Sequence, residues 1–302
     1  MLLVLTHSED AICDELIPHL GEVPFFRFNI DLWRDYRWEI TGAGYRFEDR
    51  TGRVCEEREV RAVYLRKLIF SPPYINVPAG GDEESWQREQ IIQMVNGIRD
   101  LAEVEGKLVL VRPSRTASKI RQMRLAARWF PVPEWSAYHG PGIAFKERPV
   151  VVKTFASVPV GKGSHVMVRE VVPEQLSDAH AWLIQTMLTE ASHDVTTVFV
   201  NGRLFSYELP RTFQGVDCRL PTALEDLPWL PCEITEQEAQ GIQSMMKDLH
   251  LDFGRFDFLR VNGRLWFLEV NPNGQWGWLD PAGTNGLYKA IAEEIRKAWS
   301  QG

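Results

Sequence analysis

The chain has 302 residues, with 34 Lys plus Arg, 41 Asp plus Glu and a formal net charge of −7. A hydrophobic fraction of 44% and a charged fraction of 25% are typical of a folded globular protein and exclude a collagen-like, low-complexity or disordered chain. The acidic balance argues against nucleic-acid binding, which depends on neutralisation of phosphates by Lys and Arg. At this length we expect two or three packed subdomains.

Cysteine usage and the lack of targeting or membrane-spanning signals point to the cytoplasm. Cys13, Cys55, Cys218 and Cys232 have no metal-ligand spacing, so a zinc site is not expected, and their number is ordinary for a reducing cytosol. The N-terminus lacks the basic and long apolar regions of a signal peptide. No apolar run approaches the roughly 20 residues that span a bilayer. We therefore expect a cytoplasmic protein that does not act on a membrane.

The first part of the chain predicts an open α/β sheet. A short apolar run, a helical pattern and a second apolar run form a β-α-β unit. A glycine-punctuated hairpin region, further short strands and a long amphipathic helix follow. The predicted elements are Leu2–Leu5, Asp10–Leu20, Phe25–Ile30, Tyr36–Glu48, Arg53–Val60, Val63–Leu65, Glu83–Glu105 and Leu108–Val111.

The rest of the chain predicts antiparallel α+β structure. Asn201-Gly202 and Asn262-Gly263 are hairpin turn signals, and Thr235 with Glu238 forms a capping box at the start of a helix. The predicted helices are Ser118–Trp129, Thr235–Leu249 and Gly286–Trp299. The predicted strands are Val150–Lys153, Val166–Glu170, Leu183–Met187, Val195–Val200, Leu204–Glu208, Phe256–Val261 and Leu265–Val270.

The most informative segment is the hairpin between Gly254 and Gly274. Asp257 lies on its first strand, and Glu269 and Asn271 lie two residues apart on its second strand, which places them on one face. Two carboxylates and an amide are oxygen donors that suit Mg²⁺ and suit zinc poorly. An ordinary hairpin with a polar solvent face explains the pattern about equally well.

For the other candidate residues, the evidence of a functional role is weaker when each is taken alone. Lys153 ends a β-branched run, as either a phosphate ligand or a lysine at a strand edge. Gly161 and Gly163 form a small loop whose amides could contact phosphates, although most such loops are simple turns.

A predicted strand runs into the linker from Gln185 through Met187 and Leu188 to Glu190. Its backbone could meet an adenine edge, and Glu190 could accept from ribose hydroxyls or be an exposed loop residue. Lys119 and Arg211 add cations, which are otherwise most often solvated.

In order and spacing, these residues resemble the ATP-grasp superfamily over nearly the whole chain. The segment from Phe267 to Leu279, FLEVNPNGQWGWL, resembles the signature of the microviridin-type peptide ligases, the graspetide macrocyclases. The resemblance implies an α/β and α+β protein of ATP-grasp fold. Its parts would be an N-terminal pre-ATP-grasp domain at 1–112, a small central subdomain at 113–188 and a C-terminal antiparallel subdomain at 189–302.

The resemblance also implies the roles of the candidate residues. ATP would lie between the two α+β lobes, and its phosphates would be held by Lys119, Lys153 and the loop of Gly161 and Gly163. Adenine would meet the backbone of Gln185, Met187 and Leu188, and ribose would meet Glu190. Mg²⁺ would be bound by Asp257, Glu269 and Asn271. Arg211 and Lys153 would act in catalysis, in which a carboxylate becomes an acyl phosphate that a nucleophile attacks.

Substrate recognition is implied less specifically. Arg66, Asp194 and Trp276 are the candidates for contact with a precursor peptide made of leader and core segments. Relatives often carry Arg where this chain has Thr196, and an Arg-Arg pair where it has Arg66 and Lys67. Lys keeps the charge but loses bidentate geometry.

Three functions stay open at this point. The first is a macrocyclase joining Asp or Glu side chains to Thr, Ser or Lys in a ribosomally made peptide. The second is a ligase adding an amino acid to a small molecule or a protein tail. The third is a nucleotide-binding scaffold without activity. A homodimer is left open, and neither the peptide nor the type of linkage follows from the sequence.

Overall fold

The computed structural model describes residues 1–70, 81–110, 118–138, 149–153, 155, 169–171, 176, 181–211 and 229–301. Its N-terminal part is a parallel sheet in the order β2-β1-β6-β7. The strands are β1 (Leu2–Thr6), β2 (Phe25–Asn29), β6 (Ala62–Leu65) and β7 (Leu108–Leu110). Every residue of β1 and β6 is buried, as expected for central strands covered on both faces.

Helices cover both faces of this sheet. Ile12 and Leu16 of α1 (Ala11–Leu16) pack with Leu2 and Val4, whereas α2 (Asp82–Val104) packs against the opposite face. Short 3₁₀ helices follow β-strands or α1 at η1 (Ile17–Leu20), η2 (Ile30–Asp35) and η3 (Glu57–Glu59). The architecture is therefore a doubly wound α/β layer, as the first part of the sequence predicts.

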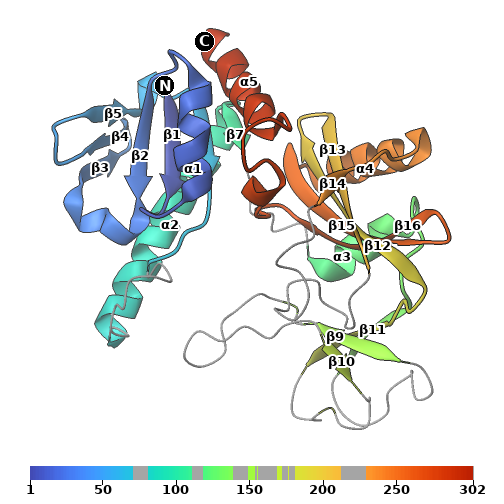
Figure 1. The fold of residues 1–302 in the computed structure, drawn as a ribbon. Coiled ribbons are helices and arrows are strands. Elements are labelled where there is room, and N and C mark those ends of the chain that lie inside the picture. The colour runs from blue at the N-terminus through green and yellow to red at the C-terminus, as the bar shows by residue number, and fades with distance from the viewer. Residues whose placement is uncertain are drawn as a thin grey trace.

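A small antiparallel sheet packs beside β2 (Figure 1). It consists of β3 (Arg37–Thr41), β4 (Gly44–Glu48) and β5 (Val54–Glu56) in that order. The ring of Phe47 lies 5.1 Å from that of Phe28, centroid to centroid, and this aromatic contact joins the two sheets.

The central part contains a four-stranded antiparallel sheet in the order β10-β9-β11-β8. The strands are β8 (Trp135–Tyr138), β9 (Val150–Lys153), β10 (Arg169–Val171) and β11 (Trp182–Thr186). Figure 1 shows it apart from the larger C-terminal sheet. Strand β8 is absent from the sequence-based prediction because Trp135–Tyr138 follows two prolines and shows no clear alternation.

The C-terminal part is a five-stranded antiparallel sheet in the order β14-β13-β12-β15-β16. The strands are β12 (Ala191–Val200), β13 (Arg203–Pro210), β14 (Leu230–Pro231), β15 (Phe253–Val261) and β16 (Arg264–Asn271). Both predicted Asn-Gly turns are present, and all four of their residues have positive φ, between 41° and 93°. That conformation is the one a two-residue type I′ hairpin turn requires.

Three helices flank this sheet: α3 (Lys119–Ala126), α4 (Glu236–Leu249) and α5 (Leu287–Ser300), with η5 (Gly277–Leu279) before α5. The predicted capping box of α4 is formed by Thr235 and Glu238. Helices α3 and α4 pack on one face, together with Val195, Phe256 and Phe267.

Helix α5 covers part of the opposite face and shares a core with the N-terminal sheet. This core joins Ile291 and Ile295 of α5 to Val198 of β12 and to Leu2 of β1. It covers only one end of that sheet face. The other end carries Thr196, Asp257 and Glu269, and there the candidate site lies.

No helix among the described residues is both long enough and apolar enough to cross a bilayer.

Candidate functional site

A β-bulge in β16 decides which way the predicted metal ligands face. Asp257 pairs with Glu269, but the next residue, Phe258, pairs with Phe267, so Leu268 has no partner on β15. Plain alternation would place Glu269 on the same buried face as Leu265 and Phe267. The extra residue shifts the phase, so that Val270 is buried instead. Glu269 and Asn271 thus join Asp257 on the polar face.

The three predicted ligands converge. The Asn271 amide nitrogen donates to Asp257 Oδ2 at 3.0 Å and to Glu269 Oε1 at 3.2 Å. Rotating this amide by half a turn would present its carbonyl oxygen at the same place. In the described parts of the chain, no three His, Cys, Asp or Glu side chains gather into a metal site, so an amide oxygen has to complete this one. An all-oxygen set of this kind fits Mg²⁺.

Two lysines lie beside Glu269. Lys119, the first residue of α3, places its Nζ 3.4 Å from Glu269 Oε2. Lys153 ends β9 and is only 8% exposed. Burial disfavours the Glu269 carboxylate, but the charges of Lys153 and Lys119 outweigh it and lower the pKa of Glu269 to about 2. The structure thus brings together a predicted metal ligand and both predicted phosphate-binding lysines.

Gln122, which the sequence prediction missed, fixes α3 to β16, the strand that carries the predicted metal ligands Glu269 and Asn271. Its side-chain amide donates to Val270 O at 2.9 Å, and its Oε1 accepts from Val270 N at 3.0 Å. Strand β16 is an edge strand, and Gln122 gives its outer backbone groups the partners that a further strand would supply. Gln122 lies three residues after Lys119 and therefore on the same helix face. This spacing is the sequence signal that could have identified Gln122 as a residue near the site.

Arg211 and Asp194 form a pair on the same sheet face. The Arg211 Nη1 lies 3.0 and 2.9 Å from the two Asp194 carboxylate oxygens, and both side chains are largely buried. Asp194 and Thr196 are two residues apart on β12, and Thr196 pairs with Asp257. The predicted catalytic arginine is therefore held by the residue that was predicted to contact substrate.

Thr196 and Arg255 support Asp257 from two sides. The buried Thr196 hydroxyl lies 3.1 Å from Asp257 Oδ1 and 3.0 Å from Phe256 O. Arg255 Nη2 donates to Asp257 Oδ2 at 2.8 Å. Sequence reasoning gave Arg255 no role, although its position two residues before Asp257 on one strand indicates a shared face.

The predicted adenine segment is only partly available to a ligand. The Met187 N–H donates to Pro149 O at 2.9 Å, so it is already engaged. Gln185 is buried, and its Oε1 has no partner within the described residues. Leu188 is half-buried and Glu190 is exposed, in the turn between β11 and β12. Gly161 and Gly163 lie outside the described residues.

Two predicted substrate residues are instead internal. The Arg66 side chain is fully buried, with Nε 3.3 Å from Asp10 Oδ2 and Nη2 3.1 Å from Gln275 Oε1. Trp276 is also fully buried, and its ring packs against Tyr288 at 4.6 Å. Both side chains help to position the segment that follows β16, and a contact of either one with a peptide stays a prediction.

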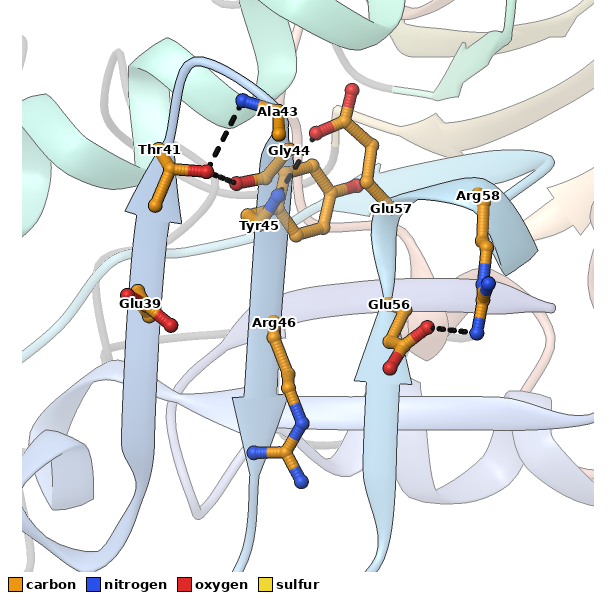
Figure 2. Close-up of a pocket in the computed structure, with 9 residues that line it drawn as sticks. All are labelled: Glu39, Thr41, Ala43, Gly44, Tyr45, Arg46, Glu56, Glu57 and Arg58. Carbon is orange, nitrogen blue, oxygen red and sulfur yellow. Dashed lines mark hydrogen bonds and ion pairs between the residues drawn. The ribbon is translucent and has the colours of Figure 1, made fainter.

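A pocket on the three-stranded sheet is separate from this site. Figure 2 shows its lining residues, in which Glu57 accepts from Tyr45 N at 3.0 Å and Glu56 pairs with Arg58 at 2.6 Å. Glu56 and Arg58 of this pocket thus partner one another, and Arg46 pairs with Glu48.

Comparisons with known proteins define the fold. Neither the protein-family models nor the curated proteins include a match. Among solved structures, the macrocyclase MdnC from Microcystis aeruginosa MRC, bound with its precursor peptide MdnA, has a TM-score of 0.79 at 19% identity, over 98% of this chain and 100% of that one.

Two further ligases extend the comparison. A RiPP-associated ATP-grasp ligase from Chryseobacterium gregarium, in complex with ADP and with leader and core peptide, has a TM-score of 0.78 at 19% identity, over 98% of this chain and 96% of that one. The D-alanine–D-alanine ligase from Bacillus anthracis, complexed with ATP, has a TM-score of 0.56 at 13% identity, over 100% of this chain and 98% of that one. The chain therefore has the fold of the ATP-grasp ligases.

Proposed function

We propose that this protein is an ATP-dependent macrocyclase. It would join the side-chain carboxylate of Asp or Glu to a Thr or Ser hydroxyl, or to a Lys amine, within a ribosomally made precursor peptide. The observation that carries the proposal is the convergence of Lys119 and Lys153 on Glu269, beside Asp257 and Asn271, in a chain with this fold. Similarity over 98% of the chain to two ligases whose structures contain bound precursor or leader and core peptides supports the peptide as substrate.

The reaction would proceed in two balanced steps. The substrate carboxylate takes the γ-phosphoryl group of ATP, which gives an acyl phosphate and ADP. The hydroxyl or amine then attacks the acyl carbon and loses a proton, and phosphate leaves. The peptide loses one water for each ring that closes.

The residues of this chain would act by positioning charge. Lys119 and Lys153 would hold the phosphates, and Arg211, oriented by Asp194, would stabilise charge on the phosphoryl group or the tetrahedral intermediate. Asp257, Glu269 and Asn271 would hold Mg²⁺, which when bound neutralises phosphate charge. The carboxylate of Asp257 would keep its place through Thr196 and Arg255.

The test is incubation with ATP, Mg²⁺ and a short precursor peptide sought among the neighbouring genes, followed by mass spectrometry. We expect mass losses of one water per ring and matching formation of ADP. The K119A variant should lose both, whereas R124A, at an exposed position of the same helix, should retain them. A gain in peptide mass would instead indicate the amino-acid-adding ligase, and no product with the correct precursor would contradict the proposal.

A further inference from the structure

The topology of the N-terminal sheet marks a second place where a ligand can bind. Strand β1 is followed by α1 on one face and leads to β2, whereas its neighbour β6 is followed by α2 on the other face and leads to β7. Adjacent strands whose connections leave in opposite directions open a crevice at their carboxyl ends. Here these ends are His7 after β1, and Arg66 and Lys67 after β6.

The carboxyl ends of β1 and β6 carry a cation, Lys67, for which the described residues supply no ion-pair partner. Arg66 pairs with Asp10, and Arg255 pairs with Asp257. Lys67 is half-buried beside these two guanidinium groups and has no hydrogen bond or ion pair within the described residues. Burial and then the charges of Arg66 and Arg255 lower the pKa of Lys67 to about 8. A half-buried ammonium among other cations is stabilised by an anion.

The same place faces the metal hairpin. Gln275 links the two arginines, because its side chain accepts from Arg66 Nη2 at 3.1 Å and its backbone oxygen accepts from Arg255 Nη1 at 2.7 Å. At the end of β1, His7 is 6% exposed, and its Nδ1 lacks a partner within the described residues. An anion at Lys67 would therefore lie close to Arg255, which itself pairs with Asp257.

We propose that the carboxyl ends of β1 and β6, together with Arg255, form a binding site for a side-chain carboxylate of the peptide substrate, with Lys67 as its principal cation. The identity of the ligand as a peptide rests on the proposed function. Among the described residues, Arg66 pairs with Asp10 and Arg255 with Asp257, so a single carboxylate would balance the remaining charge of Lys67. The adjacent Trp278, which is 43% exposed with Arg255 5.9 Å from its ring, offers an apolar wall for the neighbouring peptide residue.

The test is calorimetric titration of the whole protein, saturated with MgADP, with N-acetyl-glutamate methylamide. We expect binding at least about tenfold tighter than that of the uncharged N-acetyl-glutamine methylamide, because a charge-assisted hydrogen bond is lost in the latter. K67M should lose a similar factor, K67R should retain binding, and K289M, at an exposed position of α5, should be unchanged.

The proposal would be overturned by no binding of the glutamate derivative, by equal binding of the two derivatives, or by undiminished binding to K67M. If inorganic phosphate bound more tightly than the glutamate derivative and K67M lost that binding, the site would be a phosphate site, which would overturn the carboxylate proposal. MgADP binding is measured separately. If MgADP does not bind, the glutamate derivative is titrated into the nucleotide-free protein; binding there would contradict the proposed function and leave the carboxylate site standing.

Discussion

At the scale of single residues, the pKa of Glu269 reflects the charges that surround it. Its pKa falls from the ordinary 4.5 to about 2 because Lys153 and Lys119 favour the carboxylate over the opposition of burial. A depressed folded-state pKa stabilises the protein above the unfolded pKa, and this stabilisation disappears as pH falls from about 4.5 towards 2.

We therefore predict that E269Q lowers the free energy of unfolding of the metal-free protein most at neutral pH. The difference from the natural protein should shrink as pH falls below about 4.5. Urea unfolding in EDTA at several pH values measures it. A difference that stays constant with pH would contradict the assigned cause.

Thr196 offers a second residue-scale test. Its buried hydroxyl lies 3.1 Å from Asp257 Oδ1. We expect T196V, which keeps the shape and removes the hydroxyl, to cost about 1 kcal/mol in the free energy of unfolding. It should also weaken MgADP binding, because Asp257 loses a fixed partner. T196S is the matched control and should restore both values; equal behaviour of the two variants would show that the hydroxyl has no such role.

At the scale of elements, the Gln122 side chain determines how α3 meets β16. Q122A would leave the buried N–H and C=O of Val270 without partners, at a cost of about 1–3 kcal/mol in the free energy of unfolding. Because Lys119 is on the same helix, we also predict at least about tenfold weaker MgADP binding, measured by calorimetry.

The control for this prediction is R124A, which changes an exposed residue of α3 and should alter neither value. Q122E keeps the acceptor for Val270 N but places a buried carboxylate oxygen against Val270 O, so at neutral pH it should be at least as destabilising as Q122A. Normal MgADP affinity in a destabilised Q122A would restrict Gln122 to a structural role.

The elements also show what the sequence can and cannot predict. The Asn-Gly turns and the α4 capping box were predictable because the deciding chemistry is local. The bulge at Leu268 was not, since the residues around it carry no signal and the pairing with β15 creates it. Likewise, Trp276 and Trp278 are two residues apart, and tertiary packing in the core that contains Tyr288 makes the first internal.

At the scale of the whole molecule, one core joins the two ends of the chain. Ile291 in α5 is fully buried in the cluster that also contains Leu2 of β1 and Val198 of β12. Sequence patterns locate α5 by its amphipathic spacing, but they cannot tell which sheet it covers. It packs against both the N-terminal and the C-terminal sheets, which makes their stabilities interdependent.

We predict that I291A costs about 2–5 kcal/mol in the free energy of unfolding. Because the core is shared, hydrogen exchange measured by mass spectrometry should accelerate together in β1 and β12. The conservative I291V should cost about 0.5–1.5 kcal/mol with the same distribution. Acceleration confined to one of the two strands would show that the sheets unfold independently.

The turn from Asn273 to Gln275 has a further consequence for the length of the chain. Asn273 donates to Arg66 O, Gln275 contacts both Arg66 and Arg255, and a Cβ at Gly274 would lie 2.7 Å from the Cβ of Arg255. Most exposed loops accept inserted residues. This turn is fixed at both sides, because it contacts Arg66 after β6 and Arg255 on β15. A single added residue here would move the N-terminal sheet relative to β16. We therefore expect insertions or deletions in this segment to be poorly tolerated.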